Sequence, residues 1–217
     1  MFPLIREGCA KVSITRRLKV MKERDIIQAK QWLDSFQPIK LEAAGIMDSV
    51  GLTWLSVDDD IQAFRKTIDA AYDLGDEYDA LVNALKKLPE ILERMKAFPK
   101  SDVREVRRIQ NFEVKALNAN RDAGDLGLSW VKAQWALALM SSGETDYDVI
   151  ASKVGLTRKF VERVDKTSMI AITPSGERLD NMRYVASRLW DAVVFCLTQA
   201  HKWWAASNKV RSAFWEV

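Results

Sequence analysis

The sequence contains too few cysteine and histidine residues to build a common metal or redox centre. Its 217 residues include two cysteines, Cys9 and Cys196, and one histidine, His201. Neither cysteine has the spacing of a zinc ligand or a redox pair, and a zinc site made from Cys and His would be short of ligands. We therefore expect two reduced thiols that pack as small apolar side chains, with no metal site and no cofactor.

Glycine and proline are scarce too, with nine and five residues, so few chain breaks are expected. Apolar residues mostly recur at the spacing of amphipathic helices, as they do at Ile61, Phe64, Ile68 and Ala71. One strand-like run, residues 169–173, is closed by a Pro-Ser-Gly turn. The sequence therefore predicts a mainly α protein.

Several positions predict where helices begin or break. Pro38 is expected to break the first long helix, because proline removes a backbone donor. The three acids from Asp58 to Asp60 suit the first turn of a helix, where the helix dipole favours negative charge, so they do not require a metal. Ser101 or Asp102 is expected to cap a later helix.

Long apolar runs are absent as well, so neither a secretion signal nor a membrane span is expected. The most apolar stretch, "LWDAVVFCLTQAHKWWAA", is interrupted by Asp191, Gln199, His201 and Lys202. A glycine-rich phosphate loop and a Ser-His-Asp arrangement are also missing, and nothing else in the sequence indicates an enzyme. We expect a soluble cytoplasmic protein that is not an enzyme.

Charge is small in total but uneven along the chain. The net charge is +3; residues 1–34 hold eight basic and four acidic residues, and residues 41–81 hold two basic and ten acidic residues. The first block therefore carries +4 and the second −8. A polyanion such as DNA would be repelled by the acidic block and could be bound only by the ends of the chain.

The stretch "RDAGDLGLS", residues 121–129, is the most loop-like part of the chain and the expected domain boundary. It would separate a helical N-terminal region, residues 1–122, from a second domain, residues 128–217. The second domain ends in a long helix with an apolar stripe formed by Leu179, Met182, Ala186, Leu189, Val193, Leu197, Ala200 and Trp204. We expect a homodimer through this helix; the alternatives are packing on the chain's own core and stacking of its tryptophans on single-stranded nucleic acid.

Residues 147–166, "YDVIASKVGLTRKFVERVDK", have the pattern of two short helices joined by a tight turn. Ala151 is small enough for close helix packing, Gly155 tolerates the left-handed backbone of the turn, and Thr157 is a good N-cap. The space between the helices would be filled by Ile150, Val154, Leu156, Val161 and Val164.

This pattern resembles the helix-turn-helix superfamily of DNA-binding domains. The resemblance implies that residues 158–166 form a recognition helix in the major groove and that residues 130–140 form the supporting first helix of a trihelical unit. Residues 173–179, "TPSGERL", are similar to the segment that follows a short β wing in winged helix proteins. The contacts implied with double-stranded DNA come from Thr157, Arg158, Lys159, Arg163, Lys153 and Lys166.

Sequence-specific binding of duplex DNA, as a transcriptional regulator, is the function that this resemblance favours. One alternative is a DNA-binding packaging, replication or partition protein of a mobile element. Another is a helical interaction protein, in which residues 147–166 are an ordinary helical hairpin and the acidic residues 41–81 bind a basic partner. Residues 46–57, "IMDSVGLTWLSV", align with residues 150–161, either by coincidence or as a second copy that does not read DNA.

Overall fold

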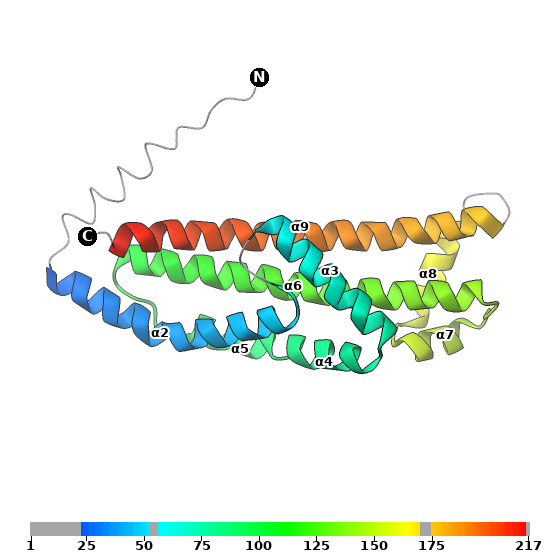
Figure 1. The fold of residues 1–217 in the computed structure, drawn as a ribbon, viewed down its shortest axis with the longest axis horizontal. Coiled ribbons are helices and arrows are strands. Elements are labelled where there is room, and N and C mark those ends of the chain that lie inside the picture. The colour runs from blue at the N-terminus through cyan, green and yellow to red at the C-terminus, as the bar shows by residue number, and fades with distance from the viewer. Residues whose placement is uncertain (1–22, 53–55, 170–174, 216–217) are drawn as a thin grey trace, which may run out of the picture.

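The computed structural model describes residues 23–52, 56–169 and 175–215, with side chains outside residues 164–186 (Figure 1). All regular structure in these residues is helical, which confirms the mainly α prediction. The helices are α2 (Glu23–Ser49), α3 (Val57–Asp73), α4 (Asp76–Leu85), α5 (Leu88–Ala97), α6 (Arg104–Ser141), α7 (Tyr147–Val154), α8 (Arg158–Met169) and α9 (Ser175–Trp215). Within the described ranges, none of these helices has the length and apolarity needed to cross a membrane.

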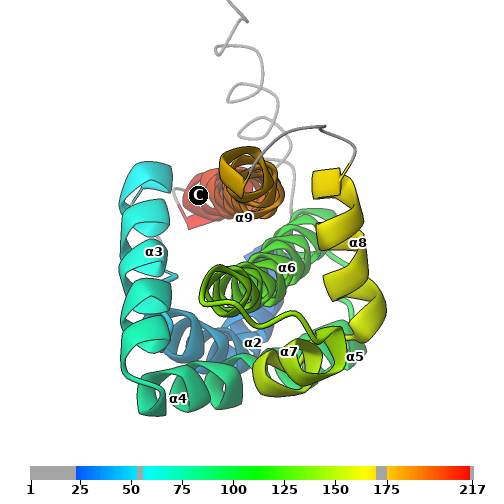
Figure 2. The same ribbon diagram turned by 90° about the vertical axis from the view of Figure 1, so that its right-hand side faces the viewer.

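Two long antiparallel helices, α6 and α9, pack against each other along the molecule (Figure 1). Viewed from one end, α6 lies in the middle of the bundle, where it also contacts α2, α3, α4, α5 and α7 (Figure 2). This packing buries Val193, Leu197, Ala200 and Trp204 of the predicted C-terminal stripe. These four side chains are therefore used within the chain's own core.

The loop expected at residues 121–129 is not present, because α6 continues through this segment without a break. Its glycines allow close packing of helices instead of a turn. A Cβ on Gly124 would lie 2.5 Å from the Leu85 side chain, and one on Gly127 would lie 2.7 Å from both Phe64 and Ile68. The two glycines therefore predicted a loop from the sequence, but in the structure they let α3 and α4 pack closely against α6.

The break expected at Pro38 is also wrong, since Pro38 lies inside α2. A proline inside a helix costs roughly 3 kcal/mol, so packing on both sides of it must offset this amount. Leu33 and Phe36 are buried before Pro38, and Ala43 and Met47 are buried after it. The axis of α2 changes direction near its middle, which is the usual response of a helix to proline (Figure 1).

The helical pattern predicted for residues 61–71 is confirmed in α3. Phe64, Ile68 and Ala71 are fully buried. The first turn is acidic as expected, and Ser56 caps it by accepting a hydrogen bond from the Asp59 N–H at 3.2 Å. The periodic apolar face and the capped acidic start therefore act together in placing α3 against α6 and α9.

A buried ionic cluster joins α2, α6 and α9. Glu113 of α6 is fully buried, and its Oε1 accepts hydrogen bonds from Ser207 Oγ at 3.0 Å and Arg211 Nη2 at 2.7 Å. Lys40 Nζ of α2 lies 2.9 Å from the same oxygen. Two cations around one carboxylate make its burial tolerable, and they hold α2 in register with the α6–α9 pair.

Candidate nucleic-acid interface at the α7–α8 corner

The segment that resembles a DNA-reading unit forms a compact corner at one end of the bundle, built from the C-terminal part of α6, α7 and α8 (Figure 2). We call it the α7–α8 corner. α7 ends at Gly155, whose φ of 62° is in the left-handed region. The Leu156 N–H bonds to the Ala151 carbonyl at 3.0 Å, which closes the end of α7. Glycine is favoured here because other residues are strained at this φ.

The apolar residues predicted for this corner form its small core. Ile150, Ala151, Val154 and Val161 are buried together with Ala136 of α6. Leu156 packs against them and is half-buried, while the side chain of Val164 lies outside the described residues. α6 and α8 are therefore both fixed to α7, and the N-terminal turn of α8 is left on the surface.

Two polar contacts hold the turn between α7 and α8. Thr157 Oγ1 accepts a hydrogen bond from the Phe160 N–H at 3.3 Å, which is the contact expected of an N-cap. Lys132 Nζ of α6 donates to the Gly155 carbonyl oxygen at 3.0 Å. The contact of Lys132 was not predicted, because no spacing in the sequence connects residue 132 with residue 155.

Arg158, the first residue of the proposed recognition helix, is exposed but paired with two acids. Its guanidinium contacts Asp148 of α7 and lies 2.6 Å from the carboxylate of Glu162, one turn further along α8. The hydrogen bond with Glu162, and then the charge of Asp148, raise the pKa of Arg158 above its ordinary value. Arg158 would have to exchange these partners before it could contact a base or a phosphate.

The other predicted DNA contacts differ in their surroundings. Lys159 and Arg163 are exposed one helical turn apart on α8, and Lys159 has no ion pair within the described part of the chain. Lys153 of α7 is exposed and lies 3.6 Å from Glu144. The side chain of Lys166 and residues 170–174, which hold most of the expected wing strand, fall outside the described residues. The ends of that expectation are wrong, because Met169 belongs to α8 and Ser175 and Gly176, expected in a turn, begin α9.

Charge at the corner is balanced. Residues 144–163 contain four bases and four acids, so their net charge is zero. The acids are Glu144, Asp146, Asp148 and Glu162. Long-range attraction of phosphates to this surface is therefore weak, and binding there would depend on a few short contacts.

The sequence echo at residues 46–57 reproduces the turn but not the corner. Gly51 has a φ of 74°, and the Leu52 N–H bonds to the Met47 carbonyl at 2.7 Å, as at Gly155 and Leu156. The following helix, however, begins only after Ser56, and α2 packs on α4, α5 and α6. The shared letters therefore encode the end of a helix, not a second pair of packed short helices.

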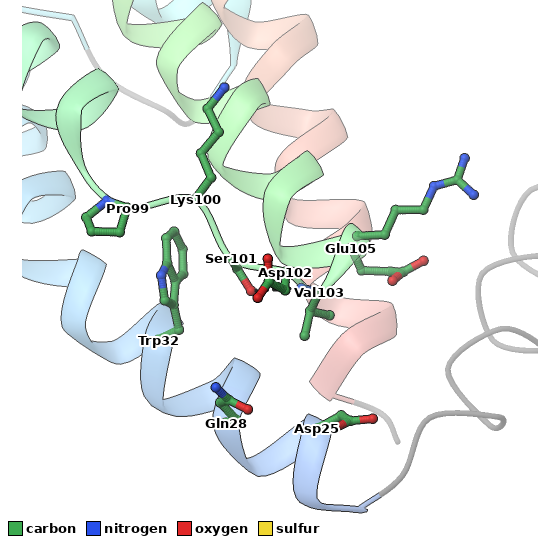
Figure 3. A pocket seen from close by; sticks show the side chains of 10 residues that line it. Asp25, Gln28, Trp32, Pro99, Lys100, Ser101, Asp102, Val103 and Glu105 are labelled. Atoms are coloured by element: carbon green, nitrogen blue, oxygen red, sulfur yellow. Dashed lines mark hydrogen bonds between the residues drawn. The ribbon is translucent and has the colours of Figure 1, made fainter.

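A pocket of about 670 Å³ lies away from the corner, between the start of α2 and the start of α6 (Figure 3). Its lining mixes Asp25, Asp102 and Glu105 with Lys100 and Arg104. Such mixed charge selects neither an anion nor a cation. No group of three or more His, Cys, Asp or Glu side chains anywhere in the described ranges is arranged to hold a metal ion.

The segment beside this pocket corrects the predicted cap of α6. The N-cap position is Val103, which has no side-chain capping bond, instead of Ser101 or Asp102. Ser101 Oγ still accepts a hydrogen bond from the Val103 N–H at 3.1 Å. The helix therefore begins one or two residues later than expected, and Ser101 supports the loop that leads into it.

No family model, no curated protein and no solved structure matches this chain.

Proposed function

We propose that the protein binds double-stranded DNA through the α7–α8 corner, with α8 in the major groove, as a sequence-specific transcriptional regulator. The observation that carries this proposal is the tight turn at Gly155, which holds α7 and α8 on α6 and leaves the first turn of α8 exposed. A recognition helix needs this arrangement, because its N-terminal residues must reach the base edges.

Lys159 and Arg163 are the strongest candidates for direct contacts, since they are exposed on one face of α8. Thr157 could contribute its hydroxyl to a phosphate, with Lys153 and Lys166 as further backbone contacts. Arg158 joins the contacts only after leaving Asp148 and Glu162. Because the corner carries no net charge, we expect weak non-specific binding and a strong dependence on the target sequence.

Dimerisation through α9 is part of the proposal. α8 packs against α9. A dimer formed through α9 would therefore present two copies of α8, one to each half-site of the DNA. Val193, Leu197, Ala200 and Trp204 of the stripe are used by the chain's own core, and the side chains of Leu179, Met182 and Ala186 lie outside the described residues. Light scattering measures the mass directly, and a monomer at all concentrations tested would exclude this part of the proposal.

The test of DNA binding is selection of bound sequences from random duplexes, followed by anisotropy titrations over a salt series. We expect Lys159→Ala and Arg163→Ala each to weaken binding to a selected site by about 1–3 kcal/mol, which is roughly 5- to 150-fold. Lys66→Ala is a matched control, because Lys66 is also exposed but lies on α3. If both α8 variants bind the selected site as tightly as the unchanged protein, α8 is not the DNA-binding helix.

A packaging, replication or partition protein of a mobile element would use the same corner. It differs from a regulator in forming oligomers larger than a dimer and in binding one or a few sites. The mass measurement and the number of selected sequences therefore separate these two roles.

A second candidate function, a helical interaction module, is favoured by the acidic residues 41–81. All ten acids of this block except Asp60 are exposed, most of them on α3 and α4. A basic protein partner would fit this surface through charge complementarity. Absence of any salt-sensitive binding to duplex DNA, together with capture of a basic partner that Asp73→Asn and Asp76→Asn weaken, would favour this function instead.

A further inference from the structure

Aromatic and basic side chains gather on one side of the α6–α9 pair, away from the α7–α8 corner. α6 contributes Arg108, Phe112 and Lys115, and α9 contributes Phe195, Lys202 and Trp203. We call these six residues the α6–α9 patch. The two helices lie side by side in both views, so the patch joins segments that are far apart in the sequence (Figures 1 and 2).

Two of the three aromatic rings of the patch, those of Phe112 and Trp203, are stacked on each other and have cations above them. Phe112 and Trp203 have ring centroids 5.7 Å apart and planes inclined by 22°. Lys115 Nζ lies 4.4 Å and Lys202 Nζ 5.5 Å from the centroid of the Trp203 ring, and Arg108 Cζ lies 5.8 Å from that of Phe112. This arrangement places positive charge directly over flat apolar surfaces.

Phe195 extends the patch along α9. Its side chain is 63% exposed, although phenylalanine is usually buried. Lys202 follows Phe195 by seven positions, so both lie on the same face of the helix, about 10 Å apart along its axis. Such an exposed ring has no role in the core and is available to a ligand.

The patch itself is basic, because its three charged residues, Arg108, Lys115 and Lys202, are all cations. Residues 104–121 and 192–215 together contain eight bases and two acids, although Arg107, Arg121 and Arg211 are paired with acids and Asp122 and Asp191 lie just outside these ranges. Both acids, Glu105 and Glu113, are buried. In the described part of the chain, the cations of the patch have no ion pairs, in contrast to Arg158 at the corner.

We propose that the α6–α9 patch binds single-stranded nucleic acid, with bases stacked on Phe195 and Trp203 and phosphates bound by Arg108, Lys115 and Lys202. Free single strands expose both of the groups that this surface fits, since every base has a flat face and every linkage a negative charge. Duplex DNA hides its base faces, and an acidic peptide would leave the rings unused. The patch is therefore distinct from the duplex-binding corner in both position and ligand.

Binding requires Lys115 to leave the ring of Trp203. An exposed cation–π contact is weaker than the stacking of a base on an aromatic side chain, so a base can replace the ammonium group. The released lysine remains beside the strand, where it can pair with a phosphate. The contacts of the free protein thus keep the ring covered until a strand arrives.

The experiment is an anisotropy titration of labelled oligothymidine, roughly 16 nucleotides long, over a salt series. We expect Phe195→Ala to weaken binding about tenfold and Lys115→Ala and Lys202→Ala each to reduce the salt slope by about 0.7. Trp203→Phe should bind more tightly than Trp203→Ala, because it keeps a ring. Trp215→Ala is the matched control, since Trp215 is an exposed aromatic residue of α9 outside the patch.

Two comparisons separate this site from the corner. Patch variants should keep the duplex affinity of the unchanged protein, and Lys159→Ala should keep its affinity for oligothymidine. If the protein does not bind duplex DNA, the proposal that the α6–α9 patch binds single strands is therefore unaffected. Because Phe195 is exposed, we expect Phe195→Ala to leave the free energy of unfolding nearly unchanged.

Three results would overturn the assignment of the patch. The first is no binding of oligothymidine at low salt. The second is equal affinity of Phe195→Ala and the unchanged protein, with polyglutamate competing as well as oligothymidine, which would reveal a surface that only attracts negative charge. The third is salt-sensitive self-association that the patch variants abolish, which would identify the acidic residues 41–81 of a second copy as the occupant.

Discussion

His201 of α9 contacts Asp60 of α3 through Nε2 and Oδ2, although 141 residues separate them in the chain. Asp60 is 2% exposed and the side chain of His201 is 16% exposed. The only histidine of the sequence thus meets the one acid of the first turn of α3 that is buried. Because α3 and α9 are in contact, this pair helps to hold the acidic helix on the long helix pair.

Replacement of His201 should therefore destabilise the fold. His201→Ala removes a partner from a buried carboxylate, and we expect the free energy of unfolding to fall by about 1–3 kcal/mol. Urea titration followed by circular dichroism measures this change. The neighbouring exposed Lys202→Ala should stay within about 0.5 kcal/mol of the unchanged protein, and an equal loss in both variants would contradict a specific role for His201.

Alanine substitutions at Gly127 of α6 and at Gly45 of α2 should change the stability of the protein in opposite directions. At Gly127 a Cβ would collide with Phe64 and Ile68, so Gly127→Ala should cost about 1–3 kcal/mol of stability. At Gly45, inside α2, a Cβ would meet nothing within 4 Å. Gly45→Ala should therefore stabilise the protein by roughly 0.5–1 kcal/mol. Thermal unfolding of the two variants gives the comparison, and stabilisation by Gly127→Ala would show that α6 packs differently.

Removal of the charge of Asp148 should strengthen duplex binding at the corner. Asp148→Asn leaves Arg158 with Glu162 as its remaining acidic partner and removes a negative charge that would face phosphates. We expect a several-fold gain in affinity and a salt slope steeper by up to about 0.9. Asp79→Asn, an exposed site on α4, is the matched control in the same titrations. A loss of affinity in Asp148→Asn would mean that Arg158 must be held by Asp148 to bind.

Cys196 should react slowly with alkylating reagents at neutral pH. Burial, and then the negative charge of Asp122, raise the pKa of the Cys196 thiol, so the reactive thiolate is less populated than in a free cysteine. In a Cys9→Ser background, the alkylation rate should rise with pH to a midpoint above that of a model thiol. Asp122→Asn should lower this midpoint, whereas Asp125→Asn should leave it unchanged. An unchanged midpoint in Asp122→Asn would exclude this carboxylate as a cause.

Several features were determined by the sequence alone because they depend on neighbours in the chain. The spacing of Phe64, Ile68 and Ala71 defines one face of a helix wherever that helix packs. Gly155 and Thr157 likewise specify the end of one helix and the start of the next through backbone geometry and a hydrogen bond to Phe160. Local dihedral preferences and caps act over a few residues, so they can be read directly.

The tertiary structure decided the features that join distant segments. α6 runs through residues 121–129 because Gly124 and Gly127 let α3 and α4 approach closely, and α2 continues past Pro38 because both of its halves are buried. Contacts across the chain also determined the pairing of Phe112 with Trp203. No local pattern encodes these contacts, since their free energy arises only when surfaces far apart in the sequence are packed together.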